Sequence, residues 1–549
     1  MFIMSVLVTQ ATHDLIWHRI NWTRCHNTVR SLQRRIVKAI REGNHRKVKR
    51  LSYVLTHSFA ATVLAIRRVT ENRGKKTAGI DGQRWNTPKK KVEAIQSVSN
   101  WRGYRPYPLK RIYIPKKNGK KRPLGIPAMV DRAKQALYLQ ALEPIAETTA
   151  EYNSYGFRPK RQCADAIEQC FLLLARKGSA QWILEGDIKG FFDNIAFEWI
   201  NKNIPINQVV MKKWLNSGYV DKGVYFPTRA GVPQGGIISP AIANMVLDGL
   251  EEVVKDDKHF QQTYRINYVR YADDFVVTGN DKRILEQVVK PRIVEFLKQR
   301  GVELSEEKTK ITHISEGFDF LGQNVRKYQS THKNKLRITP SKDSIQRIQA
   351  KIKDICKSSL HLSPTELIKR LNPVLRGWAN YHRHTICNIA FPQIDHYVYR
   401  RLMRWAKRRH PTKTGCWIKK KYFCIHQGWD WTFYDKKTGQ RLIHIPQAIK
   451  PQKHVKIRAD ANPYDEQWAE YFKTRDKNTK LKRMYGLRFK VYHKQLGVCT
   501  CCKQPLNMKQ VIELHHKDGD NRNNKVDNLV LLHLNCHRQV HHSGLDFQL

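Results

Sequence analysis

The stretch INYVRYADDFVVTG, residues 266–279, constrains the fold of this chain most, because two adjacent aspartates interrupt strand-forming sequence. Ile266–Val269 and Phe275–Thr278 are rich in Val, Ile and Tyr, and both segments predict short strands. Asp273 and Asp274 then fall at the tip of a hairpin. Asp is a common turn residue, so a solvated turn explains the pair. A divalent metal site explains it equally well, because Mg²⁺ prefers carboxylate ligands.

A metal site of this kind needs at least one more carboxylate from elsewhere in the chain. Two metal ions held by carboxylates can activate a 3′-hydroxyl group and stabilise a leaving pyrophosphate. Asp187 ends the apolar strand predicted at Gln181–Asp187, and a carboxylate at a strand end suits a site beside the hairpin. Asp193 follows shortly afterwards, but we predict that it caps the next helix rather than binding a metal.

The charge of the chain indicates a polyanionic partner. Its 549 residues include 100 Lys and Arg against 47 Asp and Glu, which gives a formal net charge of +53. Binding of cationic side chains to phosphates releases condensed counterions, so such an excess favours nucleic acid. A membrane surface is the competing partner, but the basic residues are spread along the whole chain and no apolar run approaches roughly 18 residues. We therefore predict nucleic-acid binding and no membrane association.

The N-terminus and the cysteines indicate an intracellular protein that is not secreted. The first residues, MFIMSVLVTQATHDLIWHR, contain a short apolar run with no basic residue before it, which argues against a secretory signal. The 11 cysteines are an odd number and are scattered except near the C-terminus, so a reducing compartment is expected. A bacterial cytoplasm or nucleoid, a plastid and a mitochondrion remain open.

The length predicts several domains, and the sequence pattern places their boundaries. Periodicity predicts helices over Trp22–Asn72, Asp131–Glu147 and Lys282–Arg300, with a loop at Gly74–Gly82. The basic stretch YRPYPLKRIYIPKKNGKKRPLGIP predicts two strands joined by an Asn118-Gly119 turn. The predicted segments are a helical N-terminal extension (1–100), a strand-rich unit (101–335), a helical unit (336–410), a basic segment (411–496) and a compact Cys/His-rich tail (497–549).

Several sequence blocks in this order resemble those of reverse transcriptases of the group II intron class. They are YRPYPLKRIYIPKKNGKKRPLGIP, GFRP, DIKGFFDNI, GVPQGGIISP, YADD, EKTKI, GFDFLG and LNPVLRGWANYHRH. The resemblance implies a multidomain α+β fold. It comprises a right-hand polymerase, whose fingers and palm contain an antiparallel sheet, followed by an α-helical thumb or maturase domain.

The same resemblance implies roles for individual residues. Asp187, Asp273 and Asp274 would bind two Mg²⁺ ions. Phe192 would screen against a ribose 2′-hydroxyl and so select dNTPs, although a core phenylalanine is the other interpretation. Gln234 would lie under the incoming nucleotide. Two glycines, Gly235 and Gly236, would let the backbone come close to the template and the dNTP. Four basic residues lie where fingers residues contact the triphosphate, and which of them makes the contact stays open: Lys110, Arg111, Lys121 and Arg122.

The tail contains two ligand pairs with the spacing of a structural Zn²⁺ knuckle. Cys499 and Cys502 form a C-x-x-C pair, and His533 and Cys536 form an H-x-x-C pair. Cys501 could replace Cys502, which we favour. A closed site of this kind would stabilise a tail too short to bury a core of its own.

Between and after these pairs, the tail resembles an HNH nuclease with a ββα-metal arrangement. His537 and His541 are four residues apart and so share one helix face. The resemblance implies that they and His515 lie near a divalent metal, that His516 is the general base, and that Asn528 holds the loop of that base. The residue that departs from the pattern is His533, where relatives of this module often carry Cys.

Together these resemblances imply an intron-encoded RNA-directed DNA polymerase that assists splicing of group II intron RNA. It would bind target DNA through segment 411–496 and nick it through the tail, and the nick would prime copying of the RNA template from dNTPs. The alternatives are a splicing maturase that only binds RNA and a free-standing retroelement polymerase. A monomer and a homodimer both remain open. Trp378 and Tyr381 either stack on RNA or are buried in the thumb.

Overall fold

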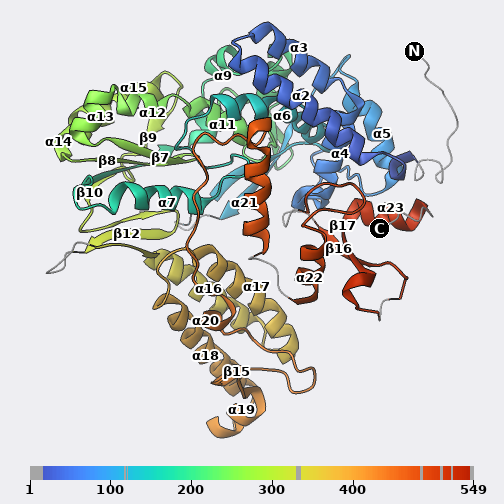
Figure 1. Ribbon diagram of the computed structural model, residues 1–549, viewed down its shortest axis with the longest axis vertical. Coiled ribbons are helices and arrows are strands. Elements are labelled where there is room, and N and C mark those ends of the chain that lie inside the picture. The colour runs from blue at the N-terminus through green and yellow to red at the C-terminus, as the bar shows by residue number, and fades with distance from the viewer. Residues whose placement is uncertain are drawn as a thin grey trace.

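A computed structural model describes residues 16–115, 119, 121–328, 335–481, 486–506, 511–520 and 523–543. The N-terminal helices, the central sheet and the helical thumb follow one another along the molecule (Figure 1). The predicted turn residue Asn118 and the N-terminal segment before residue 16 lie outside the described residues. None of the described helices is both long and apolar enough to cross a membrane.

The N-terminal region is a layer of amphipathic helices packed on one long helix. Asn21 caps the first of these helices by accepting a hydrogen bond from the Arg24 N–H at 2.9 Å. Gln33 donates to the Gln140 carbonyl at 2.8 Å, and Gln140 donates to the Ala61 carbonyl at 2.9 Å, so buried amides join three helices. The elements are α2 (Trp22–Arg41), α3 (His45–Thr56), α4 (Phe59–Glu71), a 3₁₀ turn (Arg73–Lys76), α5 (Pro88–Ser99) and α6 (Met129–Thr149). The predicted helix over Trp22–Asn72 is thus three helices, and the predicted loop at Gly74–Gly82 begins in a 3₁₀ turn.

The fingers contain a four-stranded sheet of order β2-β1-β5-β6. Its strands are β1 (Leu109–Pro115), β2 (Lys121–Ile126), β5 (Tyr219–Asp221) and β6 (Val224–Phe226). β1 and β2 are antiparallel with Lys110 opposite Ile126, which confirms the two strands predicted there. The Tyr113 hydroxyl donates to Asp221 at 2.5 Å and links β1 to the β5–β6 hairpin.

The palm contains a second antiparallel sheet of order β10-β3-β8-β7, formed by β3 (Trp182–Gly186), β7 (Asn267–Tyr271), β8 (Asp274–Gly279) and β10 (Lys310–His313). Alternate side chains enter two different cores: Leu184 and Val277 join one, whereas Ile183 and Val276 join the other. Because both faces of the sheet are buried, its strands read as nearly continuous apolar runs. The predicted hairpin around the paired aspartates is therefore confirmed.

The predicted helix over Lys282–Arg300 is divided into three parts. α14 (Lys282–Ile284) leads into a π-helical turn (Leu285–Val289), and α15 (Lys290–Lys298) follows. Pro291 lies in the first turn of α15, where its missing N–H leaves no donor for the preceding turn. The other elements of this region are α7 (Cys163–Leu174), β4 (Ile188–Lys189), α8 (Phe191–Asn194), α9 (Phe197–Asn203), α10 (Gln208–Leu215), α11 (Ser239–Leu247), α12 (Leu250–Lys255), α13 (Lys258–Tyr264) and β9 (Glu303–Leu304).

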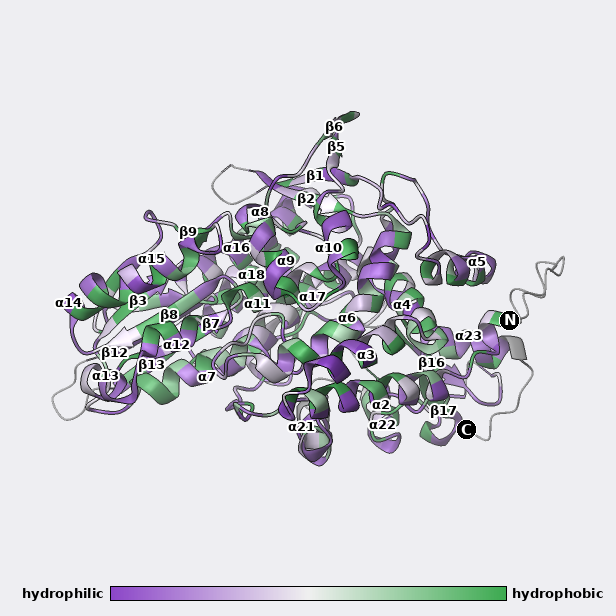
Figure 2. Cartoon of the chain, turned by 90° about the horizontal axis from the view of Figure 1, so that it is seen from above, coloured by the Kyte–Doolittle hydropathy of each residue, from purple (hydrophilic) through white to green (hydrophobic). Residues whose placement is uncertain are grey.

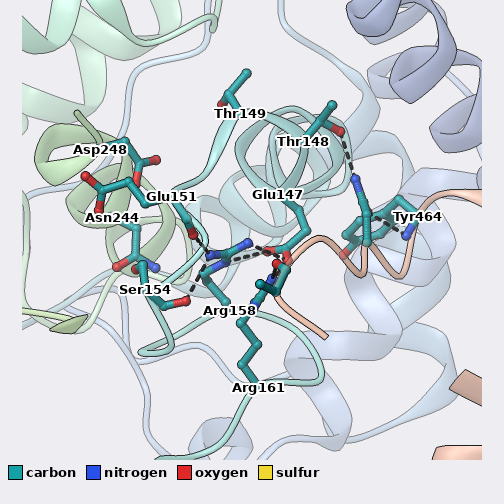
Figure 3. Close-up of polar contacts among 12 residues, drawn as sticks. Glu147, Thr148, Thr149, Glu151, Ser154, Arg158, Arg161, Asn244, Asp248 and Tyr464 are labelled. Atoms are coloured by element: carbon teal, nitrogen blue, oxygen red, sulfur yellow. Dashed lines mark hydrogen bonds and ion pairs between the residues drawn. The ribbon is translucent and has the colours of Figure 1, made fainter. Parts of the chain in front are cut away.

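Buried arginines connect the palm sheet to the end of α6. Arg158 binds Glu147 through two nitrogens, at 2.8 and 2.9 Å, and Figure 3 shows the two side chains pointing at one another. Arg270 of β7 pairs with Glu151 at 2.9 Å and Asp248 at 2.7 Å. Truncation of Arg270 would remove the cation that pairs with Glu151 and Asp248, and truncation of Arg158 would leave Glu147 only the longer contact with Arg161 at 3.4 Å. Loss of a partner from a buried ion pair is strongly destabilising.

The thumb begins after the sheet of β11 (Phe318–Phe320), β12 (Gln323–Tyr328) and β13 (Lys335–Pro340). Its elements are α16 (Lys342–Ser358), α17 (Pro364–His382), α18 (Ala390–Arg409), α19 (Gly415–Tyr422), β14 (Phe423–His426), β15 (Trp429–Phe433) and α20 (Ile445–Ala448). One apolar core extends from Ile348 to Ile449. The predicted boundary at residue 410 therefore falls inside a packed unit, because Ile418 and Phe433 belong to the same core as α16–α18.

The chain then returns along the palm before it reaches the tail. The Asp165 carboxylate of α7 forms polar contacts with His454 at 2.8 Å and with Arg475 at 2.9 Å. Ile457 and Phe472 pack in the palm core. The predicted basic segment 411–496 is thus divided among the thumb, the palm and, through Val491 and Tyr492, the core that the tail shares with the N-terminal helices. The remaining elements are a 3₁₀ turn (Glu466–Trp468), α21 (Ala469–Leu481), α22 (Gly486–Lys494), β16 (Ile512–His516), a 3₁₀ turn (Val526–Asn528), β17 (Leu529–His533) and α23 (Leu534–Ser543). In Figure 2, α15 and α23 carry both hydrophilic and hydrophobic residues, as expected of helices with one buried face.

Candidate active site and metal centres

Strand register brings the three candidate carboxylates to one end of the palm sheet. Gly186 of β3 lies opposite Phe275 of β8, so Asp187 follows directly beside Asp274. Asp274 pairs with Tyr271 across the hairpin, which leaves only Ala272 and Asp273 in the turn. Ala272 has a φ of +60°, a strained conformation for a residue with a side chain.

The GFRP block, residues 156–159, packs against the turn at Ala272 and Asp273. The Tyr155 N–H donates to the Arg270 carbonyl at 2.9 Å, so this segment runs beside β7. A Cβ atom on Gly156 would lie 2.3 Å from the Ala272 nitrogen. Only glycine fits at this position, and the block therefore determines where the carboxylates sit.

The carboxylates repel one another in the absence of a cation. Desolvation, and then the charges of Asp273 and Asp187, raise the pKa of Asp274 to about 6. Desolvation also raises the pKa of Asp273, and the positive charges of Arg122 and Lys308 oppose that rise. Three oxygen donors of this kind suit a hard divalent ion such as Mg²⁺.

Lys308 is a site residue that the sequence analysis did not single out. Its Nζ lies 2.7 Å from Asp187 Oδ2, and it comes from the loop between β9 and β10. It belongs to the EKTKI block, to which the resemblance assigned no role for any one side chain. Sequence spacing alone could not place this lysine beside the three carboxylates, because 121 residues separate it from Asp187.

Asp193 does not cap the next helix, so that prediction is wrong. It lies inside α8, and α9 starts after Ala196, which makes no side-chain cap. Gln234 donates to Asp193 Oδ2 at 3.3 Å. The carboxylate thus holds the amide of the PQGG loop rather than a helix terminus.

The PQGG loop is docked on the fingers hairpin. The Gly125 N–H donates to the Gln234 carbonyl at 2.9 Å. Gly235 has a φ of +124°, and a Cβ atom there would lie 2.6 Å from the Gly125 oxygen. Glycine is therefore required for the contact between loop and hairpin, in addition to any approach of substrate.

Phe192 is only half-buried and does not belong to the interior of the palm core. Its ring meets that of Phe157 edge-on, with centroids 6.4 Å apart. The Val232 N–H donates to the Phe192 carbonyl at 2.7 Å, which fixes the backbone of this residue next to the PQGG loop. The side chain thus has an accessible face near the carboxylates' end of the palm.

The two fingers arginines project from opposite faces of their hairpin. Arg122 lies opposite Ile114, whereas Arg111 lies opposite Gly125, and neighbouring positions along a strand alternate faces. Arg111 stacks over the Tyr219 ring at 3.7 Å. Arg122 is exposed, and its charge acts on Asp273 and Asp274, so it is the arginine better placed to meet a triphosphate.

The tail brings four Cys and His side chains together. Ligand atoms of Cys499, Cys502, His533 and Cys536 all lie within 4.8 Å of one another, and all four residues are buried. Cys501 instead points its sulfur toward Gln539 Oε1, at 3.8 Å. The geometry thus selects Cys502 over Cys501 for a tetrahedral thiolate and imidazole site, which is the donor set of structural zinc.

Three further histidines form a second, more open cluster. Ligand atoms of His515, His537 and His541 lie within 4.8 Å of one another, and His541 is exposed. Burial, and then the neighbouring His537, lowers the pKa of His515, which favours the neutral ring that binds metals. Glu513 Oε2 lies 2.7 Å from His537 Nδ1 and orients that ring, a contact that the sequence analysis missed.

His516 and Asn528 lie at the two ends of the segment that connects β16 to β17. His516 ends β16 on the opposite side of the strand from His515, and its Nε2 lies 3.4 Å from Asn524 Oδ1. Asn528 donates to Asp518 at 2.8 Å and to the Asn523 carbonyl at 2.9 Å. It therefore closes the loop that follows His516.

The two thumb aromatics differ in exposure. Trp378 is half-buried, donates to Ser344 Oγ at 3.2 Å and packs against Phe391. Tyr381 is 41% exposed, and its hydroxyl donates to the Leu321 carbonyl at 2.7 Å. Trp378 thus contributes to the thumb core, whereas the Tyr381 ring is available for stacking.

Comparison with known proteins agrees with this architecture. Residues 114–325 match the reverse transcriptase (RNA-dependent DNA polymerase) family, residues 17–98 match the N-terminal domain of reverse transcriptase, and residues 345–423 match the group II intron maturase-specific domain. Protein YkfC of Escherichia coli (strain K12) is 29% identical over 307 residues, which cover 49% of this chain and 81% of that protein.

Two further relatives are intron-encoded or maturase-like. Maturase-like protein 1 of Euglena gracilis is 24% identical over 371 residues, which cover 66% of this chain and 77% of that protein. The group II intron-encoded protein LtrA of Lactococcus lactis subsp. cremoris is 30% identical over 433 residues, which cover 61% of this chain and 70% of that protein. Three carboxylates at one end of the palm sheet, a maturase-specific thumb and this relationship together show that the chain belongs to the group II intron-encoded reverse transcriptases and maturases.

Proposed function

We propose that this reverse transcriptase and maturase also nicks DNA through its tail, and that the 3′-hydroxyl at the nick primes reverse transcription of the intron RNA. The observation that carries the proposal is the presence of two different donor clusters in one small module. The Cys₃His cluster is buried and closed, as structural zinc sites are, whereas the three-histidine cluster is partly exposed. Three protein ligands with open positions are typical of a catalytic metal site.

The residues around the open cluster fit a metal-assisted hydrolysis. A divalent ion held by His515, His537 and His541 would polarise the scissile phosphate. His516 is the candidate general base that takes a proton from water, and Asn528 positions the loop behind it. Glu513 accepts from the His537 ring and keeps its other nitrogen free for the metal.

For the polymerase, we propose that Asp187, Asp273 and Asp274 hold the two Mg²⁺ ions that the reaction requires. Arg122 would neutralise triphosphate charge, and Phe192 would reject a ribose 2′-hydroxyl. Gln234 and Gly235 would lie against the incoming nucleotide, since the PQGG loop joins the palm to the fingers hairpin.

The net charge of +53 and the exposed Tyr381 support extensive contact with intron RNA. The basic segment 411–496 is proposed to contact target DNA. A maturase that only binds RNA is the alternative. Three retained carboxylates favour the active polymerase, because RNA binding alone does not require them.

The test uses the complex of full-length protein and intron RNA on a duplex made of the joined flanking exons, with each strand labelled in turn. The expected result is one nick in the strand whose 3′-hydroxyl is then extended. His537→Ala and His516→Ala should remove the nick but leave extension of an annealed primer intact. His493→Ala, an exposed histidine outside the cluster, is the matched control. Nicking that survives both cluster variants would reject the tail as the nuclease.

A further inference from the structure

The tail is packed into the core of the N-terminal helices. Trp17 donates from Nε1 to Asn535 at 2.9 Å, and Gln539 donates to the Ile20 carbonyl at 3.2 Å. Figure 1 shows β17 and α23 beside α4. One apolar cluster contains buried residues from both ends of the chain: Trp17, Trp22, Val29, Ile36, Cys499, Leu506, Leu531 and Cys536. The zinc ligands thus lie within a core that α2 and α4 help to build.

Arg67 of α4 reaches into the buried Cys₃His cluster from this core. Its side chain is 7% exposed, and its Nη2 lies 3.8 Å from Cys536 Sγ. The guanidinium lies 4.8 Å from the Trp22 ring centroid, and its Nε donates to Glu71 at 3.2 Å. Three separate contacts therefore fix this cation against the cluster, although 469 residues separate it from Cys536 in sequence.

The charges of the cluster explain why a cation is needed there. Three thiolates and one neutral imidazole around Zn²⁺ leave one net negative charge, and an uncompensated buried charge is strongly destabilising. Arg67 supplies one positive charge, while Glu71, which is 9% exposed, adds a negative one. Lys91 is also buried, and its Nζ lies 5.2 Å from the Trp17 ring centroid. The negative charge of Glu71 attracts the Lys91 ammonium group. Two cations thus balance Glu71 and the loaded cluster.

We propose that the zinc site is shared between the two ends of the chain: the tail supplies four ligands, and Arg67 of the N-terminal region supplies the compensating charge. The inference rests on the zinc site proposed above. Zinc binding and docking of the tail then stabilise one another by the same free energy, because such coupling is reciprocal. The alternative is that Arg67 only forms an i,i+4 ion pair with Glu71, which would stabilise α4 whether or not zinc is bound.

The first experiment measures the zinc content of the full-length protein and the rate at which zinc is transferred to a chromogenic chelator. We expect one zinc per chain in the wild type. Arg67→Met should release zinc about ten times faster or more, since outer partners of metal ligands typically contribute 10- to 100-fold. Arg68→Met is the matched control, because Arg68 is the next residue of α4, is 44% exposed and pairs instead with Glu143. Its release rate should equal that of the wild type.

The second experiment uses the wild type, and therefore does not depend on the folding of a variant. Hydrogen exchange is compared before and after removal of zinc by the chelator. Exchange should rise in peptides that cover α4 and α2 as well as in the tail, and α15 in the palm serves as the internal reference. Unchanged exchange in α4 would overturn the inference.

The outcomes separate this inference from the proposed function. One outcome is that the wild type holds one zinc and nicks DNA, while the Arg67→Met and Arg68→Met variants release zinc at equal rates. This outcome would support the proposed nuclease and overturn the role of Arg67. A wild type purified without zinc would overturn both the zinc site and its shared charge, while the nicking assay would still test the histidine cluster.

Discussion

The Lys308 Nζ lies 2.7 Å from Asp187 Oδ2, so a cationic side chain contacts one of the three candidate metal-binding carboxylates. Lys308 is 63% exposed, whereas Asp187 is 22% exposed. The lysine therefore lies on the solvent side of the three candidate carboxylates. Its charge offsets part of the repulsion among the three carboxylates.

Lys308→Ala should slow primer extension about tenfold, because Asp187 loses the partner that orients it. Binding of the RNA template should change little, since one exposed cation among many is removed. The measurement is single-turnover extension at saturating RNA, with the template affinity determined separately. Lys310→Ala, two residues further along at an exposed position, should extend at the wild-type rate. Equal losses in the two variants would mean that general charge matters here, not the contact with Asp187.

Asp273→Ala/Asp274→Ala should abolish extension of a primer on an RNA template and leave splicing assistance nearly unchanged. Asp273 lies in the hairpin turn and Asp274 begins β8 at the same end of the sheet, whereas the thumb core is built from separate helices. Both activities are measured on the same preparation, with melting temperature as the check on folding. A parallel loss of splicing would show that the palm hairpin also serves the RNA fold.

Phe192→Ala should reduce the preference for dNTPs over NTPs. The half-buried ring presents one face to the site, and its removal opens space for a 2′-hydroxyl group. A steric change of this size is worth about 10- to 200-fold in discrimination. The readout is the ratio of kcat/KM for dTTP and UTP on one template, which cancels any general loss of activity. An unchanged ratio would assign Phe192 to packing against Phe157 alone.

Stability should fall as the pH drops below about 6.5, in part because of His382. This residue joins thumb and palm through contacts of 2.8 Å to Ser344 and 3.0 Å to Gln323. Burial, and then the charge on His384, lowers its pKa to about 3. The unfolded chain therefore takes up a proton that the folded protein excludes, so this contribution is complete above the unfolded pKa and is lost as the pH falls. The loss is at most about 1.4 kcal/mol per pH unit.

The measurement is the melting temperature between pH 7.5 and 5. His382→Gln should be less stable at pH 7.5 but should lose less stability on acidification than the wild type. His361→Gln, at an exposed position, should follow the wild-type curve. If His382→Gln and the wild type lose stability in parallel, other histidines carry the effect.

Sequence pattern alone predicted those features that depend on local order. The alternation around residues 266–279 identified the hairpin, and its partner strand β3 ends at Gly186, one residue before the predicted end at Asp187. Asp193 shows the limit of such reasoning: it follows a strand and precedes a helix, which is where caps occur, but its position is set by a loop that begins with Gly231. Spacing cannot detect a partner 41 residues away.

Long-range packing accounts for the other differences. Segment 411–496 has no clear period because its apolar residues serve three different cores: that of the thumb, that of the palm, and the one that the tail shares with the N-terminal helices. Two short ligand pairs predicted a local Cys and His cluster, and the fold does bring those four side chains together, whereas Arg67 carries no signal of its own. A basic residue on an amphipathic helix is ordinary, and only the fold places it next to Cys536.

The docking of the tail on α2 and α4 has a consequence for how such a module is gained and lost in evolution. A stop codon after residue 496 would not simply shorten the polymerase, because it would expose Trp17, Trp22 and the apolar helix faces beside them to solvent. It would also leave Arg67 without its contact to Cys536. Descendants that discard the tail are therefore expected to carry polar replacements on these two helices. Such paired changes would leave a trace of the lost module in the opposite end of the gene.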